Sequence, residues 1–444
     1  FINDNIINNA LKKIIFEDST LEKLLKTLRK NICKKISQNS NFINQSELLF
    51  IIALGEQCFL NEYVYYLSEK ENISLNKIIK ECRDGELNEI NISILACYFP
   101  LYKLLDRIPS IKSFKSNNQD FKELINLQIS EPEIELVLSQ KIQKLGSIKD
   151  NISQKVKAQY EENPYPRWKY RDPFRKKKFN IKEIINNEIK PNYINYKIDN
   201  RQLKVLVAGC GTGQHIVDTQ RYRNATIMGI DLSSTSLSYA QRKLNELQIN
   251  NVKLIQMDIL EVKLLNEQFD IIECSGVLHH MKDPLKGLKA LLEILNEYGY
   301  LKLGLYSQLA RQDVIKARNY ITKNRLQANK NSIRKFRKTV FSENSSELNS
   351  LIFDPDFYTT SECRDLCFHA QEHRFTMYQL QEILKSNELT FLGFLLPQQI
   401  KSLYKQYFPE DKKQTNLQNW AKFEEKYTNT FRAMYQFWIC KKEN

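Results

Sequence analysis

One continuous stretch of the chain, residues 203–307, constrains the fold more than any other. The apolar run Val205–Ala208 leads directly into the glycine turn Gly209–Gly213, and a second apolar run ends in Asp231. A third apolar run ends in Asp258. A strand, a glycine turn, a helix, a strand and an acidic residue follow in this order in βαβ units that bind nucleosides. The stretch therefore predicts an α/β domain with a ligand site at the carboxyl ends of parallel strands.

The turn and the strand ends predict the chemistry of that site. Gly209 and Gly211 permit a sharp turn and let a ligand touch the backbone, since no Cβ fills the space. Asp231 is expected to accept hydrogen bonds from both hydroxyls of a ribose, and Asp258 from the exocyclic amine of an adenine. No Gly-Lys-Ser/Thr sequence follows, which excludes a phosphate-binding P-loop. The candidate cofactor-binding residues are Gly209, Cys210, Gly211, Thr212, Gly213, Gln214, His215, Asp231, Leu232, Asp258, Ile259, Ser275 and Gly276.

The composition narrows the class of protein. The nine cysteines include no Cys-x-x-Cys pair, which argues against a disulfide scaffold or a zinc site and suits the reducing cytoplasm, so no metal is expected. No apolar run approaches the ~20 residues that span a bilayer, so membrane insertion is not expected. The formal net charge is +14, but the basic residues mostly alternate with acidic ones along helices, so no nucleic-acid partner is expected.

With 444 residues the chain is too long for one ordinary core, so several domains are expected. Apolar residues at helical spacing predict an N-terminal helical domain. The residues between the fifth and sixth expected strands are too many for a loop and predict an inserted domain. The expected segments are the helical domain, with a possible role in dimerisation, at 1–150, a connector at 151–200, the nucleoside-binding domain at 201–307, the inserted middle domain at 308–374 and a C-terminal part that completes the sheet at 375–444.

The connector contains the segment Gln159–Trp168, which reads QYEENPYPRW, and its two prolines oppose both helix and central strand. Its ring faces and carboxylates are groups that hold a cationic lysine side chain. A lysine acceptor must lose a proton, because only about one in a thousand is neutral at pH 7 with a reference pKa near 10.4. In the alternative interpretation the rings only pack the connector onto the sheet. The candidate catalytic residues here are Tyr160, Glu161, Glu162, Tyr165 and Trp168.

Two further candidates are His279 and His280, which follow the fourth expected strand. A histidine at this place can act as a general base near neutral pH. The alternative, that the histidines are structural and hydrogen-bonded, is left open by the sequence.

The glycine spacing, the two strand-terminal aspartates and the segment Cys274–His280 resemble the class I methyltransferases that use S-adenosylmethionine. The alternative is a nicotinamide enzyme. The resemblance implies an α/β fold with a Rossmann-like, seven-stranded class I methyltransferase sheet whose last strand is antiparallel. It also implies S-adenosyl-L-methionine as the cofactor and S-adenosyl-L-homocysteine as the product.

Three segments together, Gln159–Trp168, Cys58–Tyr65 and Cys363–Phe375, are similar to the rickettsial protein-lysine methyltransferases of outer membrane protein B. This resemblance implies a protein substrate methylated on lysine, a bacterial outer membrane surface protein, modified in the cytoplasm before export. It also implies a homodimer. A methyltransferase that acts on RNA or a small metabolite is the alternative, and a catalytically silent scaffold is a third hypothesis, which the intact glycine turn and Asp231 disfavour.

Overall fold

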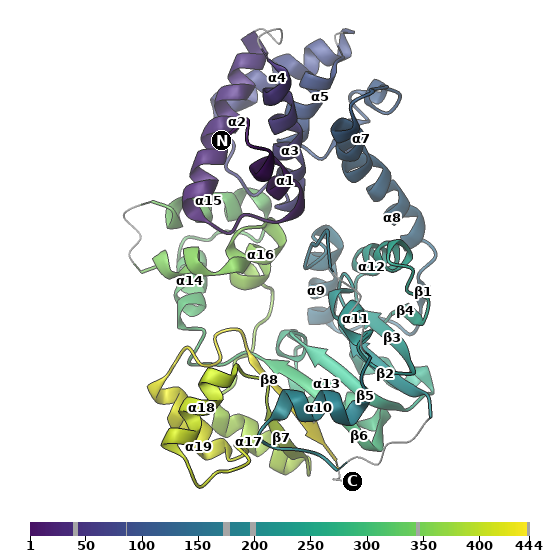
Figure 1. The fold of residues 1–444 in the computed structure, drawn as a ribbon, viewed down its shortest axis with the longest axis vertical. Helices are drawn as coiled ribbons and strands as arrows, with labels where there is room; N and C mark the ends of the chain where they lie inside the picture. The colour runs from purple at the N-terminus through teal and green to yellow at the C-terminus, as the bar shows by residue number, and fades with distance from the viewer. Residues whose placement is uncertain (39–42, 86, 172–177, 196–200, 343–346, 442–444) are drawn as a thin grey trace. The chain divides into compact units, whose positions relative to one another are not determined.

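The structure is a computed structural model that describes residues 1–38, 43–85, 87–171, 178–195, 201–342 and 347–441 (Figure 1). The chain divides into two compact units. The helical unit comprises residues 1–137, 167–170 and 316–368, and the sheet unit comprises 138–166, 171–315 and 369–444. These boundaries cut across the segments expected from the sequence, because compactness depends on packing between residues that are distant in the chain.

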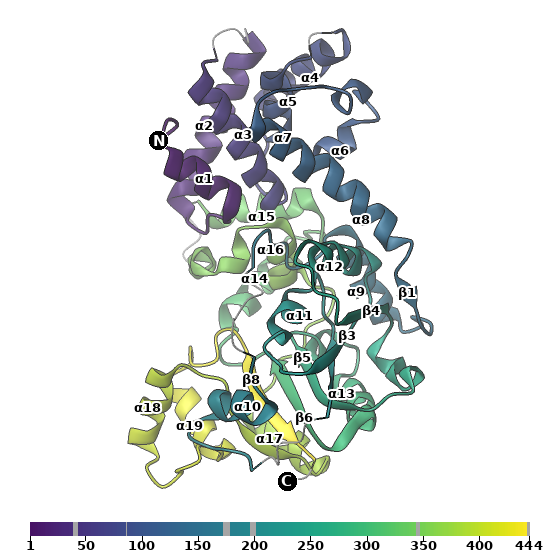
Figure 2. The ribbon, with the colours of Figure 1, turned by 45° about the vertical axis from the view of Figure 1, so that its right-hand side comes forward.

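The helical unit is built around α3 (Gln45–Leu60), which is buried from Phe50 to its end. Asn44 begins this helix with a capping box that includes Glu47. A helix that is apolar on all sides must be surrounded by other helices, and α1, α2, α5 and α7 all pack on α3 (Figure 2). Its helices are α1 (Asn5–Lys13), α2 (Ser19–Gln38), α3, α4 (Glu69–Arg83), α5 (Glu89–Ala96), α6 (Leu101–Leu104), α7 (Gln119–Ile125), α15 (Lys330–Val340) and α16 (Thr360–Phe368), while α8 (Glu131–Ser139) and α14 (Gln312–Lys323) each run from one unit into the other.

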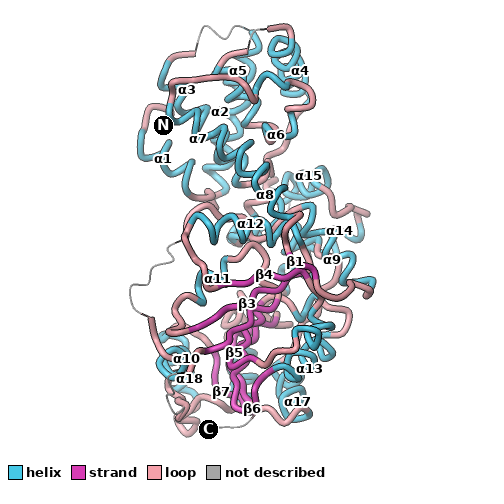
Figure 3. Tube along the Cα trace, turned by 90° about the vertical axis from the view of Figure 1, so that its right-hand side faces the viewer, coloured by secondary structure: helices cyan, strands magenta, loops and turns pink. Residues whose placement is uncertain are grey.

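The sheet unit contains one sheet with the strand order β1-β4-β3-β2-β5-β6-β8-β7. Figure 3 shows its strands in magenta. The pairs from β1 to β6 are parallel, and β8 is antiparallel to both of its neighbours. The strands are β1 (Gln143–Lys144), β2 (Leu203–Ala208), β3 (Ala225–Asp231), β4 (Val252–Gln256), β5 (Phe269–Ser275), β6 (Leu295–Leu305), β7 (Thr390–Phe394) and β8 (Tyr435–Cys440). The expected antiparallel final strand is confirmed.

The expected number of seven strands is wrong by one. The additional strand, β1, has only two residues and pairs with β4 at the edge of the sheet. Two exposed residues carry no alternation of apolar and polar side chains, so no sequence pattern marks them. The other seven strands lie within a few residues of their expected positions.

Alternate residues of each strand pack on opposite faces of the sheet, as the strand period of two requires. Leu206 contributes to the core on the face covered by α13 (Pro284–Ile294), α17 (Met377–Ser386) and α19 (Leu417–Lys426). Val205 and Val207 contribute to the core on the other face. That face is covered by α10 (Ile181–Ile189), α11 (Gln214–Thr219) and α12 (Ser234–Glu246). The remaining helices of the sheet unit are α9 (Asn151–Glu162) and α18 (Gln398–Tyr407).

A buried ion pair lies on the α10 face of the sheet. Arg221 donates to the carboxylate of Glu273 in β5 at 2.8 Å, and the Tyr222 hydroxyl donates to the same oxygen at 2.6 Å. Although burial acts in the opposite direction, the charges of Arg221 and Lys302 and these bonds lower the pKa of Glu273 to about 2. The pair therefore keeps a charge inside the core of the sheet unit.

Among the described residues, no helix combines the length and the apolar character that crossing a membrane requires.

Candidate active site

The glycine turn is fixed to the end of the neighbouring strand. The N–H groups of Gly209 and Cys210 both donate to the carbonyl of Ile230, at 2.8 and 3.0 Å. Gly209 has a φ of 74°, in the left-handed region that glycine adopts without strain. The sequence therefore folds here into the sharp turn that the glycines predicted.

The space beside the first two glycines is filled by the chain itself. A Cβ on Gly209 would lie 2.3 Å from Cγ2 of Val277, and a Cβ on Gly211 would lie 2.6 Å from the carbonyl oxygen of Tyr165. The prediction that a ligand touches the backbone of this turn stays a prediction. Glycine is needed at both positions because other parts of the sheet unit approach the turn.

Asp231 ends β3 and organises the loops around it. Its Oδ2 accepts from the N–H of Gly211 and its Oδ1 from the N–H of Ser233, each at 2.9 Å. Burial raises the pKa of Asp231 to about 6, and the nearby Glu161 carboxylate acts in the same direction. A carboxylate offers about four lone pairs, so acceptor capacity remains for a ribose hydroxyl.

Asp258 follows β4 and caps the short helix η4 (Ile259–Leu265), with its Oδ1 accepting from the N–H of Leu260 at 3.0 Å. The side-chain amide of Gln256, the last residue of β4, donates to the carbonyl of Leu232 at 2.8 Å. This bond joins the ends of β3 and β4, so the two aspartates are held at one edge of the sheet.

The fourth strand end is formed by Ser275 and Gly276. A Cβ on Gly276 would have no heavy atom nearer than Cε of Met434, at 4.0 Å, so a ligand can approach the backbone here. All thirteen cofactor candidates thus lie at the carboxyl ends of β4, β3, β2 and β5, which are neighbours in the sheet. Those not yet placed are Thr212 and Gly213 in the turn, Gln214 and His215 at the start of α11, and Ile259 at the start of η4.

The QYEENPYPRW segment lies against the glycine turn. The N–H of Thr212 donates to the carbonyl of Tyr165 at 3.4 Å, and the Thr212 hydroxyl donates to the carbonyl of Pro166. The expectation that prolines exclude helix from the whole segment is wrong for its first part, because α9 continues to Glu162, before the first proline.

The carboxylate of Glu161, a residue of α9, lies at the start of α12. Its two carboxylate oxygens accept from the backbone N–H of Ser234 at 2.8 Å and of Thr235 at 3.1 Å, and both hydroxyls donate to it as well. A carboxylate at a helix N-terminus stabilises the helix. The placement favours a role in holding α9 on α12 beside Asp231.

A series of aromatic rings extends from the connector to the end of β6. Tyr160 and Tyr165 stack with centroids 6.3 Å apart, and the Tyr160 hydroxyl lies 3.2 Å from Nε2 of His369. His369 stacks on His280 at 3.5 Å. The series continues through His279 to Tyr306, which stack at 3.7 Å. Because Tyr165 also contacts the glycine turn, these rings adjoin the cofactor candidates.

The backbone of Gln371 fixes the tautomers of two of these histidines. Its N–H donates to Nδ1 of His369 at 3.2 Å, so the neutral ring of His369 carries its proton on Nε2 and donates it to Tyr160. Its carbonyl lies 2.8 Å from Nδ1 of His280 and must accept, so the neutral ring of His280 has its lone pair on Nε2. One ring is therefore arranged as a donor and the other as a base.

His279 differs from both interpretations that the sequence left open. Its ring is fully buried, and neither nitrogen has a hydrogen-bond partner among the described residues. Burial, with His280 and Arg311 nearby, lowers the pKa of His279 well below its usual range. The ring is therefore neutral and contributes by packing between His280 and Tyr306.

The two remaining catalytic candidates, Glu162 and Trp168, belong to different units. Glu162 is exposed at the last residue of α9. Trp168 is buried and belongs to the helical unit. Their catalytic roles stay predictions.

Residues 199–353 match the family described as a methyltransferase domain. An uncharacterised protein of Synechococcus sp. is 29% identical over 203 residues, 43% of this chain and 48% of that protein. A tRNA U34 carboxymethyltransferase of Campylobacter curvus is 26% identical over 204 residues, 42% of this chain and 68% of the enzyme. PKMT2 from Rickettsia typhi in complex with AdoHcy aligns with a TM-score of 0.45 and 19% identity over 60% of this chain and 55% of that one. The chain spans about half the length of several curated relatives that it matches.

The family match coincides with the parallel strands and glycine turn described above. The chain carries a class I methyltransferase domain. S-adenosylmethionine is the cofactor of this domain. The alternative of a nicotinamide enzyme is therefore rejected. The residues present fit the cofactor, because Asp231 and Asp258 offer carboxylates at neighbouring strand ends and Gly276 leaves its backbone approachable.

The sequence did not indicate several of the residues that shape the site. Val277 packs on the glycine turn, Ser234 and Thr235 receive Glu161, and Gln371 sets the histidine tautomers. For Gln371, the sequence offered one indication, which is that the neighbouring His369 lies in a segment rich in cysteine and histidine. No local pattern indicates which distant backbone such a histidine contacts.

Proposed function

We propose that this protein transfers methyl groups from S-adenosylmethionine to lysine side chains of a protein substrate, with a bacterial outer membrane surface protein as the expected acceptor. The observation that carries the proposal is the ring series beside the glycine turn, in which Tyr160, His369 and His280 form one connected group. Such a group suits an amine that is cationic in water and must react as the neutral form.

When bound, the cofactor would supply a methyl group on a positively charged sulfur: the lone pair of the neutral amine would form the new nitrogen–carbon bond, and the thioether S-adenosylhomocysteine would leave with the electrons of the carbon–sulfur bond. The protein must therefore position the amine and accept its proton. The Tyr160 hydroxyl oxygen, which accepts from His369, has a second lone pair that can accept from the amine N–H. Nε2 of His280 is the basic nitrogen that takes the proton.

The proposal is tested by incubating the protein with cofactor labelled in the methyl group and three separate acceptor pools, of protein, RNA and small metabolites. We expect label in the protein pool, recovered as methylated lysine after acid hydrolysis. The Asp231→Ala variant serves as the control for cofactor-dependent label. Label confined to RNA or to metabolites would contradict the lysine proposal.

A second candidate function is methyl transfer to RNA. It is favoured by the alignment with the tRNA U34 carboxymethyltransferase, which spans 204 residues, and by the net charge of +14. Label that disappears after ribonuclease treatment and survives protease treatment would support this second candidate.

A further inference from the structure

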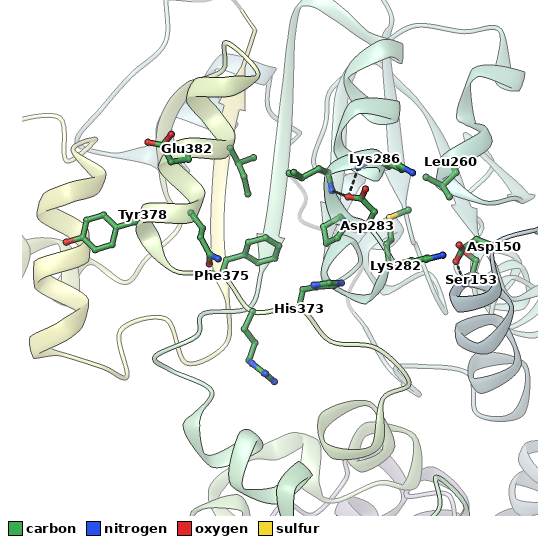
Figure 4. A pocket seen from close by; sticks show the side chains of 16 residues that line it. Asp150, Ser153, Leu260, Lys282, Asp283, Lys286, His373, Phe375, Tyr378 and Glu382 are labelled. Carbon is green, nitrogen blue, oxygen red and sulfur yellow. Dashed lines mark hydrogen bonds between the residues drawn. The ribbon is translucent and has the colours of Figure 1, made fainter. Parts of the chain in front are cut away.

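A pocket of about 920 Å³ opens in the sheet unit, and Figure 4 shows the side chains that line it. Its walls are the start of α13, one side of α17, the segment His373–Phe375, and residues from η4 and the start of α9. None of the thirteen cofactor candidates lines it. Its volume lies in the range of ligand pockets, and the methyl-transfer chemistry leaves it without a role.

The lining of this pocket is largely apolar, and part of it is exposed. Met281, Phe375 and Ile383 line it together with three side chains that remain well exposed, namely Leu260 at 38%, Leu285 at 42% and Tyr378 at 52%. Exposed apolar side chains gathered around a hollow mark a binding surface. The pocket is therefore suited to a large apolar side chain.

Some of the charged side chains that line the pocket already make hydrogen bonds within the protein. Asp283 caps α13 by accepting from Leu285 and Lys286, and Asp150 caps α9 by accepting from Ile152 and Ser153. Arg374 donates to the carboxylate of Glu372 at 3.1 Å.

Two lysines at the pocket stay available. Lys282 and Lys286 are exposed, and within the described part of the chain the side-chain ammonium group of neither makes a hydrogen bond or an ion pair. Glu382, the remaining acidic side chain of the lining, lies on the opposite wall, on α17, with its carboxylate directed away from the two lysines (Figure 4). The α13 wall is thus positive and complements an acidic group.

The wall between the pocket and the ring series is a single stretch of chain. The N–H of His373 donates to the carbonyl of His279 at 2.7 Å, and the N–H of Phe375 donates to the carbonyl of Tyr306 at 2.8 Å. His373 and Phe375 also line the pocket. A segment bound in the pocket therefore contacts the stretch of chain that is hydrogen-bonded to His279 and Tyr306, two members of the ring series.

We propose that this pocket is a docking site for a segment of the protein substrate, one that carries a large apolar side chain next to an acidic residue. The inference rests on the proposed function, because it takes the acceptor to be a protein. The apolar side chain enters between Leu260, Phe375 and Leu285, while the acidic residue pairs with Lys282 and Lys286. The site holds the substrate through contacts remote from the reacting amine.

The test uses the full-length protein and a fluorescein-labelled synthetic peptide that contains phenylalanine and glutamate but no lysine. We expect saturable binding by fluorescence anisotropy, weakened at least about tenfold by Lys282→Glu combined with Lys286→Glu. Leu285→Ser should weaken it as well, because this exposed side chain contributes only to the pocket. The matched control is Lys289→Glu, on the same helix but outside the pocket, which should bind normally.

Absence of peptide binding, or equal binding by the Lys282→Glu/Lys286→Glu variant and the Lys289→Glu control, would overturn the docking site. Binding of free phenylacetate in the pocket without binding of the peptide would overturn it too. Since the peptide has no lysine, this outcome is independent of methyl transfer. Peptide binding without any label on protein lysines would instead remove the proposed function and leave the docking site.

Discussion

The Nε2 atom of His369 lies 3.2 Å from the hydroxyl oxygen of Tyr160, although the two residues are 209 positions apart in the chain. This contact connects the segment beside the glycine turn to the histidines that follow β5. If it serves methyl transfer, Tyr160→Phe removes the group that positions the acceptor amine and keeps the ring. We expect kcat to fall about tenfold or more with unchanged affinity for the cofactor, measured by steady-state transfer and calorimetry.

The matched control for this variant is Tyr298→Phe, which removes the hydroxyl of an exposed tyrosine in β6. It should leave kcat unchanged. An unaltered kcat in Tyr160→Phe would show that the hydroxyl only packs the connector.

Asp231→Ala should weaken cofactor binding at least about tenfold, because hydrogen bonds to a charged acceptor contribute about 1.5–3 kcal/mol. Calorimetric titration with S-adenosylmethionine measures the change. Asp106→Ala, in an exposed stretch of the helical unit, serves as the control and should bind normally. Equal affinities of the two variants would refute the assignment of Asp231 to the ribose.

The raised pKa of Asp231 also predicts how cofactor affinity depends on pH. The carboxylate is the form that accepts from the ribose, and its pKa in the folded protein is about 6. Lowering the pH from 7.5 through 6 protonates it, so affinity should fall over this range. Asp231→Asn cannot titrate and should show a flatter profile, and identical slopes for the two proteins would contradict the prediction.

Glu273→Gln should lower the free energy of unfolding by about 3–5 kcal/mol at pH 7, because it leaves the charge of Arg221 without its nearest partner. Urea unfolding measures the loss. The control is Glu267→Gln at the more exposed pair with Lys204, where less than about 1 kcal/mol is expected.

The pH dependence of this effect has a definite sign. The pKa of Glu273 is lowered from 4.5 to about 2, so the folded state binds fewer protons than the unfolded state between these values. The stabilisation is complete above pH 4.5 and is lost as the pH falls toward 2. The difference between the wild-type protein and Glu273→Gln should therefore shrink in acid, and a difference independent of pH would argue against the ion pair.

Gly209→Ala should be more destabilising than Gly276→Ala, although the two glycines have similar φ values of 74° and 78°. Both variants incur about 1–2 kcal/mol of left-handed backbone strain. Only Gly209→Ala adds a clash, with Val277, and such overpacking costs about 1–3 kcal/mol more. Thermal unfolding without cofactor compares the two variants. Equal shifts in Tm would show that the Val277 side chain moves away from the added methyl group without loss of stability.

The sequence by itself determined the sheet and the positions of the cofactor candidates. Short apolar runs that end in glycine or aspartate are local signals, and each of the expected strands from 203 to 305 was found. The two-residue strand β1 was not predicted, because a strand this short has no detectable period of apolar and polar residues. The location of the candidate site at the carboxyl-terminal edge of the sheet could also be predicted, since the ends of neighbouring parallel strands must lie together.

Only the tertiary structure decided which groups meet at that edge. The carbonyl of Tyr165 lies beside Gly211, and Glu161 caps α12. The backbone of Gln371 sets the tautomers of His280 and His369. Apart from the contact between Gln371 and His369, these contacts join residues far apart in the chain, and such pairings depend on packing geometry rather than on any periodic pattern within one segment.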